Sequence, residues 1–201
     1  MFIVAATPRS GTAYASKVFR SAGIDVGHEV YGMDGISSWL HLYDIDYIPW
    51  LSKPSVAQKY DAILHQVRDP LKSVSSMMTS SKPAVDIMRS IAGDPEAKHN
   101  KSELSLIMHF WFAMNEMING RADYWYRVED MEESWPKILK VIGQKDRPFP
   151  LVEKNVNGRE HAVLTWKNLR MENRFLHGQM LRKAERYGYQ NDQSKHNFRG
   201  G

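Results

Sequence analysis

The sequence predicts an α/β fold in which helices cover a parallel β-sheet. Short apolar runs of strand length occur at 2–6, 24–27, 62–67 and 124–128. Segments with apolar residues at helical spacing, such as 104–118, separate these runs. Strands that alternate with helices form parallel sheets with helices on both faces. We therefore expect a three-layer α/β/α architecture with a central parallel sheet, and a ligand at the carboxyl ends of the strands.

The first 23 residues predict a strand, a tight loop and a helix in succession. The run at 2–6 has the length and the β-favouring composition of a buried strand. Apolar residues then recur at helical spacing from Ala15 to Ala22, and Gly23 stands where a helix typically ends. The loop between them contains one Pro, one Arg, one Gly and three hydroxyl side chains, in the order Thr7-Pro8-Arg9-Ser10-Gly11-Thr12.

A loop of this composition, between a strand and a helix, is suited to hold a phosphate group. Its backbone N–H groups can face one point, and the helix N-terminus adds partial positive charge there. Arg9 would supply a full positive charge. The alternative is an ordinary turn whose Ser and Thr side chains only cap the helix. The Walker A pattern is absent, which disfavours an enzyme that uses ATP or GTP with Mg²⁺.

The second strand is expected at 24–27 and leads to His28 and Glu29. Both side chains would then stand at a carboxyl strand end beside the first loop. Residues 30–60 show no clear period, so loops and short helices are expected there. Aromatic side chains in that stretch would either stack on a sugar or belong to the core.

The third strand, at 62–67, ends at Arg68. Asp69 and Pro70 then fit the N-cap and first position of a helix that runs to about residue 78. Arg68 at the strand end and Ser76, two turns into this helix, could reach one phosphate group. The alternative is a capped helix start with a local ion pair.

The remaining elements alternate in the same way. A largely apolar helix, a fourth strand and two further helices are expected at 104–118, 124–128, 134–143 and 171–187. We expect 1–189 to form a single domain, because 201 residues are enough for one α/β core. The polar segment 190–201 is expected to be disordered.

Composition narrows the classes of function. The net charge of +4 is mild and the basic residues are scattered, which favours an anionic small ligand or an acidic substrate over a nucleic acid. The chain has no cysteine, and its eight histidines form no H-x-x-x-H pair, so no metal site is expected. No segment has the length of a membrane span and nothing marks secretion, so a cytoplasmic location is expected.

Two of these motifs resemble the nucleotide-binding motifs of sulfotransferases that use PAPS (3′-phosphoadenosine 5′-phosphosulfate). The first loop is similar to their 5′-phosphosulfate loop, and Arg68 with Ser76 eight residues later is similar to their 3′-phosphate site. The resemblance implies a P-loop-like topology and a sulfuryl transfer from PAPS to a hydroxyl or amine, with PAP as product and no metal. It assigns nucleotide binding to six loop and helix residues: Pro8, Arg9, Ser10, Gly11, Thr12 and Ala13.

Fainter similarities follow towards the C-terminus. Tyr126 to Met131 resembles a Y-E-D-L segment of the family, where Glu129 and Asp130 are expected to cap the next helix or to pair with Arg127. Arg159, seven residues before Trp166, resembles a family arginine that wraps the 3′-phosphate. The family's flanking Lys-Gly and Gly-Asp are missing here, so an ordinary surface Arg remains the alternative.

The resemblance also suggests the catalytic groups. Arg9 stands at the position of the family's catalytic Lys, where it would stabilise the leaving phosphate oxygen by its charge. Members of the family use as the base either a His in a K-T-H type strand or a Glu after the second strand, and no Lys-Thr-His occurs in this sequence. Glu29 is our choice and His28 the alternate, with a solvated pair of side chains as the non-functional interpretation.

Two other functions remain open at this point. One is a P-loop-type kinase of nucleotides or small molecules, disfavoured by the missing Gly-Lys-Ser/Thr. The other is a non-catalytic nucleotide-binding module of the same fold. The acceptor could be a small molecule, a glycan or another hydroxyl-bearing compound, and the sequence indicates neither the acceptor nor the oligomeric state.

Overall fold

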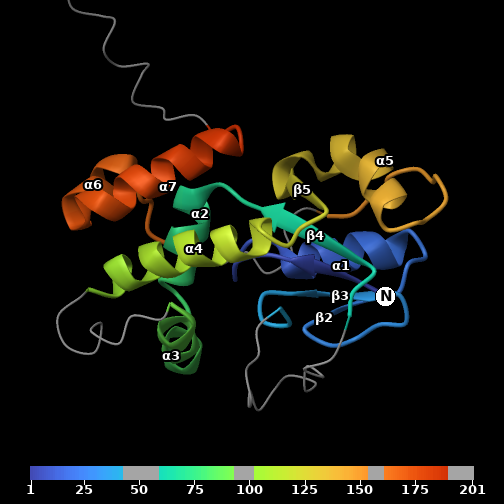
Figure 1. Cartoon of the computed structure of the whole chain (residues 1–201), viewed down its shortest axis with the longest axis horizontal. Coiled ribbons are helices and arrows are strands. Elements are labelled where there is room, and N and C mark those ends of the chain that lie inside the picture. The colour runs from blue at the N-terminus through green and yellow to red at the C-terminus, as the bar shows by residue number, and fades with distance from the viewer. Residues whose placement is uncertain (43–58, 93–101, 154–160, 190–201) are drawn as a thin grey trace, which may run out of the picture. The chain divides into compact units, whose positions relative to one another are not determined.

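The computed structural model describes residues 1–42, 59–92, 102–153 and 161–189 (Figure 1). The chain divides into two compact units, and each is described by itself. One unit comprises Met1–Arg68 with Asn115–Glu160, and the other comprises Asp69–Met114 with His161–Gly201. The segment 190–201, expected to be a disordered tail, lies outside the described residues.

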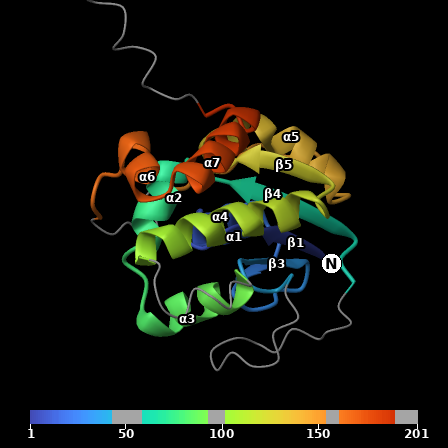
Figure 2. The same cartoon turned by 60° about the vertical axis from the view of Figure 1, so that its left-hand side comes forward.

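The first unit contains a five-stranded sheet in which every pairing is parallel. The strand order is β2-β3-β1-β4-β5, and Figure 2 shows β3, β1, β4 and β5 as neighbouring arrows. The strands are β1 (Phe2–Ala5), β2 (Val26–His28), β3 (Gly35–Ser38), β4 (Ala62–Val67) and β5 (Tyr124–Arg127). The expected α/β class and its parallel sheet are therefore confirmed. Because all strands run the same way, the segments that follow them share one edge of the sheet.

One face of the sheet carries the core of this unit. Side chains of β1 and β4 pack there against α1 (Thr12–Ser21) and α5 (Met131–Val141). The Phe19 ring of α1 lies with its centroid 5.3 Å from that of Phe2 and 5.3 Å from that of Trp135. Fully burying a large apolar side chain stabilises a fold by about 1.5–3 kcal/mol. This packing fixes the start of α1 relative to the end of β1, and thereby the loop between them.

The opposite face of β4 contributes a polar contact. His65 is fully buried, and its Nε2 lies 3.0 Å from Oδ1 of Asn115 in α4 (Glu103–Asn119). The bounds of α4 also match the helix expected from the apolar spacing at 104–118.

The second unit contains α2 (Pro70–Met77), α3 (Lys82–Ile91), α6 (Trp166–Glu172), α7 (Arg174–Arg186) and the N-terminal part of α4. The Asp69 carboxylate accepts a hydrogen bond from the Lys72 N–H at 3.0 Å, and Pro70 occupies the first turn of α2. The expected N-cap and proline position are confirmed. None of the helices in the described part of the chain is long and apolar enough to cross a membrane.

Three expectations about local structure were wrong. The stretch 30–60, interpreted as loops and short helices, contains β3 at Gly35–Ser38. A Cβ at Gly35 would come within 2.6 Å of the Phe2 carbonyl oxygen, so the strand needs glycine there. Ser37 is fully buried and its hydroxyl donates to the Thr12 carbonyl at 2.9 Å. A strand built from Gly and buried Ser lacks the apolar alternation that reveals most strands.

The other two errors concern helix ends. The helix expected from Ser134 begins at Met131, because a 3₁₀ turn at Val128–Asp130 leads directly into it. The single last helix expected at 171–187 is two helices, α6 and α7, separated by Asn173. The backbone of Asn173 is extended, and its side chain accepts a hydrogen bond from the Leu176 N–H at 3.0 Å. Asn173 therefore ends one helix and caps the next.

Candidate functional site

The loop between β1 and α1 has the backbone shape of an anion-binding turn. Arg9 and Gly11 both adopt left-handed backbone angles, with φ of 63° and 90°, whereas Ser10 between them does not. Successive residues of alternating hand turn their N–H groups towards one side and form a concave anion site. Gly11 is also the N-cap residue of α1, so the N-terminus of that helix faces the same region.

Buried side chains of the neighbouring strands hold this loop. The Gln66 amide donates to the Ser10 carbonyl at 2.7 Å, and the Tyr126 hydroxyl donates to the Gln66 carbonyl at 2.9 Å. Within the loop, the Thr7 and Ser10 hydroxyl oxygens are 2.6 Å apart. Our sequence interpretation missed the roles of Gln66 and Tyr126. The available signal was a neutral amide in a mostly apolar strand, because a buried amide requires hydrogen-bond partners.

Arg68 contacts the same loop, and Gly11 within the loop is closely surrounded by other side chains. Arg68 follows β4, and its Nη1 donates to the Arg9 carbonyl oxygen at 2.5 Å, which brings a full positive charge to the loop. A Cβ added to Gly11 would meet Val128 Cγ2 at 3.0 Å and Gln66 Nε2 at 3.3 Å. Glycine is thus needed at position 11 for its backbone angle and for the space.

The end of β2 lies next to the first residue of α1. His28 Nε2 is 3.1 Å from the Thr12 hydroxyl oxygen and 3.8 Å from Oε1 of Glu29. The His28 side chain is 39% exposed, whereas that of Glu29 is only 18% exposed. Burial lowers the pKa of His28, which favours its neutral form.

The Glu29 carboxylate is largely buried, and its two oxygens have different surroundings. Its Oε2 accepts a hydrogen bond from the Ser38 hydroxyl at 2.7 Å, whereas its Oε1 is buried and has no hydrogen-bond partner among the residues that the structure describes. Burial raises the pKa of Glu29 to about 7, although bonds from the Ser38 hydroxyl and the Trp39 N–H oppose the shift. A carboxylate that titrates near neutral pH is suited to accept and release a proton.

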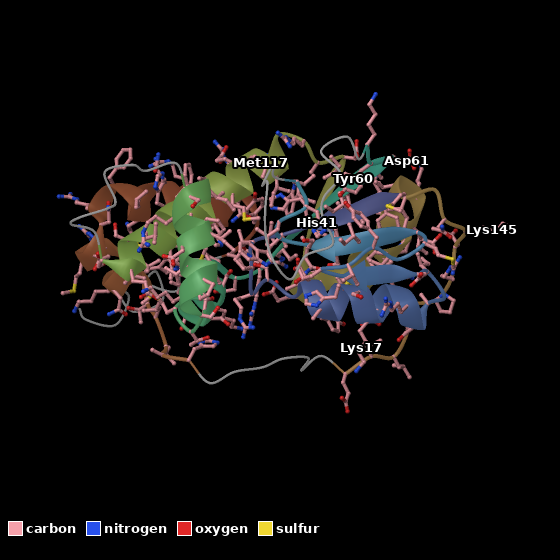
Figure 3. All side chains as sticks on the ribbon, turned by 90° about the horizontal axis from the view of Figure 1, so that it is seen from below. Lys17, His41, Tyr60, Asp61, Met117 and Lys145 are labelled. Carbon is pink, nitrogen blue, oxygen red and sulfur yellow. The ribbon has the colours of Figure 1, made fainter. Side chains whose placement is uncertain are left out.

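The hydrogen bond from Ser38 to Glu29 is part of a larger group of contacting side chains. His41 Nδ1 is 2.6 Å from the Ser38 hydroxyl oxygen, and the Tyr31 ring packs edge-on against the His41 ring. The Tyr31 and Tyr60 hydroxyl oxygens are 3.1 Å apart, and Tyr60 and His41 lie close together in Figure 3. The sequence interpretation missed Ser38 and His41, because nothing in a segment without a period marks them as neighbours of Glu29.

The structure places the predicted residues as follows. The loop residues, Arg68, His28 and Glu29 belong to the sheet-bearing unit and occupy its carboxyl edge. Ser76 is buried in α2 of the other unit, and Arg159 lies outside the described residues. Asp130 pairs with Arg127 as expected, but its side chain makes no capping bond to α5. Among the described residues, no three His, Asp or Glu side chains are grouped so that they could hold a metal ion.

No family model matches this chain, and no curated protein or solved structure is significantly similar to it. The geometry of the loop and of the carboxylate beside it therefore carries the functional assignment proposed below.

Proposed function

We propose that this protein is a PAPS-dependent sulfotransferase. The observation that carries the proposal is a left-handed loop containing Arg9 at the start of α1, with the largely buried Glu29 carboxylate separated from Thr12 by the His28 ring. Such a loop suits the 5′-phosphosulfate group, and the carboxylate suits the proton of an acceptor hydroxyl or amine. We also infer a three-layer, P-loop-like topology, since α1 and α5 cover one face of the sheet and Asn115 of α4 contacts the other.

The loop would bind the phosphosulfate through its backbone. The residues are Pro8, Arg9, Ser10, Gly11, Thr12 and Ala13, and the first N–H groups of α1 have no acceptor within the helix. Arg68 adds charge at the Arg9 carbonyl. Assignment of Arg68, Ser76 and Arg159 to the 3′-phosphate stays a prediction from the sequence.

The proposed reaction moves one sulfuryl group and one proton. The acceptor oxygen or nitrogen forms a bond to sulfur, and the bond between sulfur and the bridging oxygen of the 5′-phosphate breaks. The bridging oxygen leaves on PAP, and Glu29 accepts the acceptor's proton. Arg9 stabilises the charge that develops on the leaving oxygen, because a guanidinium keeps its proton and acts by charge and hydrogen bonds.

His28 has a supporting role in this scheme. Its ring lies between the Thr12 hydroxyl and Glu29 Oε1, and burial favours its neutral form, so it can orient either group. If Glu29 is not the base, His28 is the alternate.

Calorimetric titration of the full chain tests the proposal. We expect PAP to bind, adenosine 5′-phosphosulfate, which lacks the 3′-phosphate, to bind more weakly, and ATP with Mg²⁺ to bind weakest. Preferential binding of ATP with Mg²⁺ would instead favour a kinase. Binding of PAP without any transfer from labelled PAPS would favour a non-catalytic module.

Two glycine variants provide a matched control for this titration. Gly11 and Gly143 both have positive φ, but Gly11 has close neighbours whereas a Cβ at Gly143 would meet no atom of the described residues within 4 Å. Gly11→Ala and Gly143→Ala therefore share a backbone strain of about 1–2 kcal/mol, and only Gly11→Ala should lose PAP binding. Equal binding by the two variants would contradict a phosphate-binding role of the loop.

A further inference from the structure

The hydroxyl of Ser38 joins Glu29 to His41. Its oxygen lies 2.7 Å from Glu29 Oε2, 2.6 Å from His41 Nδ1 and 3.1 Å from the Leu40 backbone nitrogen. Ser38 and His41 are buried, with exposed fractions of 1% and 5%. None of these contacts is needed to form the sheet, because the main chain of β3 pairs with β1 and β2 independently.

Counting hydrogens fixes the direction of each bond. A serine hydroxyl has one hydrogen to donate and two lone pairs to accept with. When Glu29 is ionised, the hydrogen goes to its Oε2, and the Leu40 N–H occupies one lone pair. His41 Nδ1 must then be the second donor, so His41 carries its proton on Nδ1. The Ser38 hydroxyl is thereby saturated and cannot rotate without losing a bond.

This arrangement makes the two oxygens of Glu29 different. Ser38 holds Oε2, whereas Oε1 is buried, has no hydrogen-bond partner in the described part of the chain, and lies 3.8 Å from His28 Nε2. A buried carboxylate oxygen without a partner is costly, and such exceptions occur at functional sites. The backbone of Glu29 is also left-handed, with φ of 58°, which is uncommon for a residue other than Gly, Asn or Asp. Strain of this kind persists where the surroundings enforce it, and it concentrates at active sites.

We propose that Ser38 and His41 are positioning residues that hold Glu29 through Oε2 and leave Oε1, beside His28, as the oxygen that takes up a proton. The proposal rests on the proposed function, in which Glu29 is the base. The titratable groups that contact this network in the described part of the chain are His28 on one side and His41 with Tyr31 and Tyr60 on the other.

Carbon-13 NMR of the side-chain carboxyl groups tests the positioning without any substrate. In the full chain, Ser38→Ala should raise the pKa of Glu29 by about one unit or more, because the ionised form loses a charge-assisted bond. Ser38→Thr keeps the hydroxyl and should leave the pKa of Glu29 close to that in the unmodified protein. Ser16→Ala is the matched control, since Ser16 is also buried and its hydroxyl donates only to the Val26 carbonyl. It should leave the pKa of Glu29 unchanged.

Variants of His41 distinguish the effect of its hydrogen bond to Ser38 from the effect of its packing. His41→Leu removes the donor to Ser38 and should raise the pKa of Glu29 by less than Ser38→Ala does. His41→Asn places an amide N–H near the former Nδ1 and should reverse most of that shift. If the pKa of Glu29 in His41→Asn equals that in His41→Leu and not that in the unmodified protein, the positioning role of His41 is overturned.

Turnover of PAPS supplies the second readout. Ser38→Ala and His41→Leu should lower kcat about tenfold or more at pH 7 with little change in KM for PAPS, since they act on proton transfer. An unchanged pKa of Glu29 in Ser38→Ala would overturn the positioning role whatever the activity. A shifted pKa in a protein that transfers no sulfuryl group would instead overturn the proposed function and leave the hydrogen-bonded network intact.

Discussion

Replacement of Glu29 by Gln should stabilise the fold at alkaline pH. The folded protein raises the pKa of Glu29 to about 7 by burial, whereas the ordinary value is 4.5. A group that binds its proton more tightly in the folded state makes folding less favourable as the pH rises between these two values. Gln resembles the neutral carboxyl group in shape and carries no charge, so Glu29→Gln removes this pH-dependent cost.

The size of the effect follows from the shift. Below about pH 4.5 the carboxyl group is protonated in both states and contributes no pH dependence. Between about pH 4.5 and 7 the unfolded chain has released the proton and the folded chain retains it, so stability falls as the pH rises. At about 1.4 kcal/mol for each unit of pKa, the rise from 4.5 to about 7 gives a full cost of roughly 3–4 kcal/mol well above pH 7. The side chain is only 18% exposed, so solvent screening reduces this figure little.

Urea unfolding at pH 4.5 and at pH 8 measures this cost. The free energy of unfolding of the unmodified protein should fall between the two pH values by up to ~3 kcal/mol more than that of Glu29→Gln. Glu153→Gln makes the same change at an exposed carboxylate and serves as the control, which should follow the unmodified protein. If Glu29→Gln shows the same pH dependence as the unmodified protein, the carboxylate is not destabilised by burial and its assignment as a base loses its physical support.

Further outcomes are expected from activity and binding. Glu29→Gln should lower the turnover rate by a factor of about 10²–10⁴ with PAP affinity nearly unchanged. His28→Ala should lower the turnover rate by a smaller factor. Loss of turnover in His28→Ala but not in Glu29→Gln would make His28 the base. Arg9→Ala should reduce kcat more than affinity, as single-turnover kinetics would show, because charge on the leaving oxygen develops in the transition state. Arg68→Ala should weaken PAP binding by about 1.5–3 kcal/mol in calorimetry, and equal losses for a nucleotide without the 3′-phosphate would mark Arg68 as structural.

The parts of the fold that the sequence predicts well are local. The first strand, its loop and its helix are adjacent in the chain, and the apolar period changes visibly from one element to the next. Asp69 and Pro70 likewise specify the start of α2 within a few residues. Such signals need no knowledge of the rest of the chain.

The missing parts depend on contacts between distant residues. β3 has a Gly and two buried Ser residues in place of apolar ones. Its serines are tolerated because Thr12 of α1 and Glu29, which follows β2, accept their hydrogen bonds. Asn173 breaks the last helical pattern, although the apolar spacing runs through it. The left-handed backbone at Arg9 also has no sequence signal, since Arg is not a residue that favours it.

For the candidate site, the sequence predicts which strand ends meet but not how their side chains pair. Glu29, His28 and the loop were expected at one edge, and the structure brings them together. The inequality of the two Glu29 oxygens depends on Ser38, nine residues away, and was therefore invisible in the sequence.

Transfer of sulfur-35 from labelled PAPS tests the central claim most directly. The full chain would be incubated with labelled PAPS and a heat-treated extract of small molecules and glycans, and labelled products separated by chromatography. We predict a labelled product whose formation Glu29→Gln reduces by about 10²–10⁴ and Gly11→Ala abolishes. A product that forms equally fast with Glu29→Gln, or label that never leaves PAPS while PAP also fails to bind in calorimetry, would contradict it.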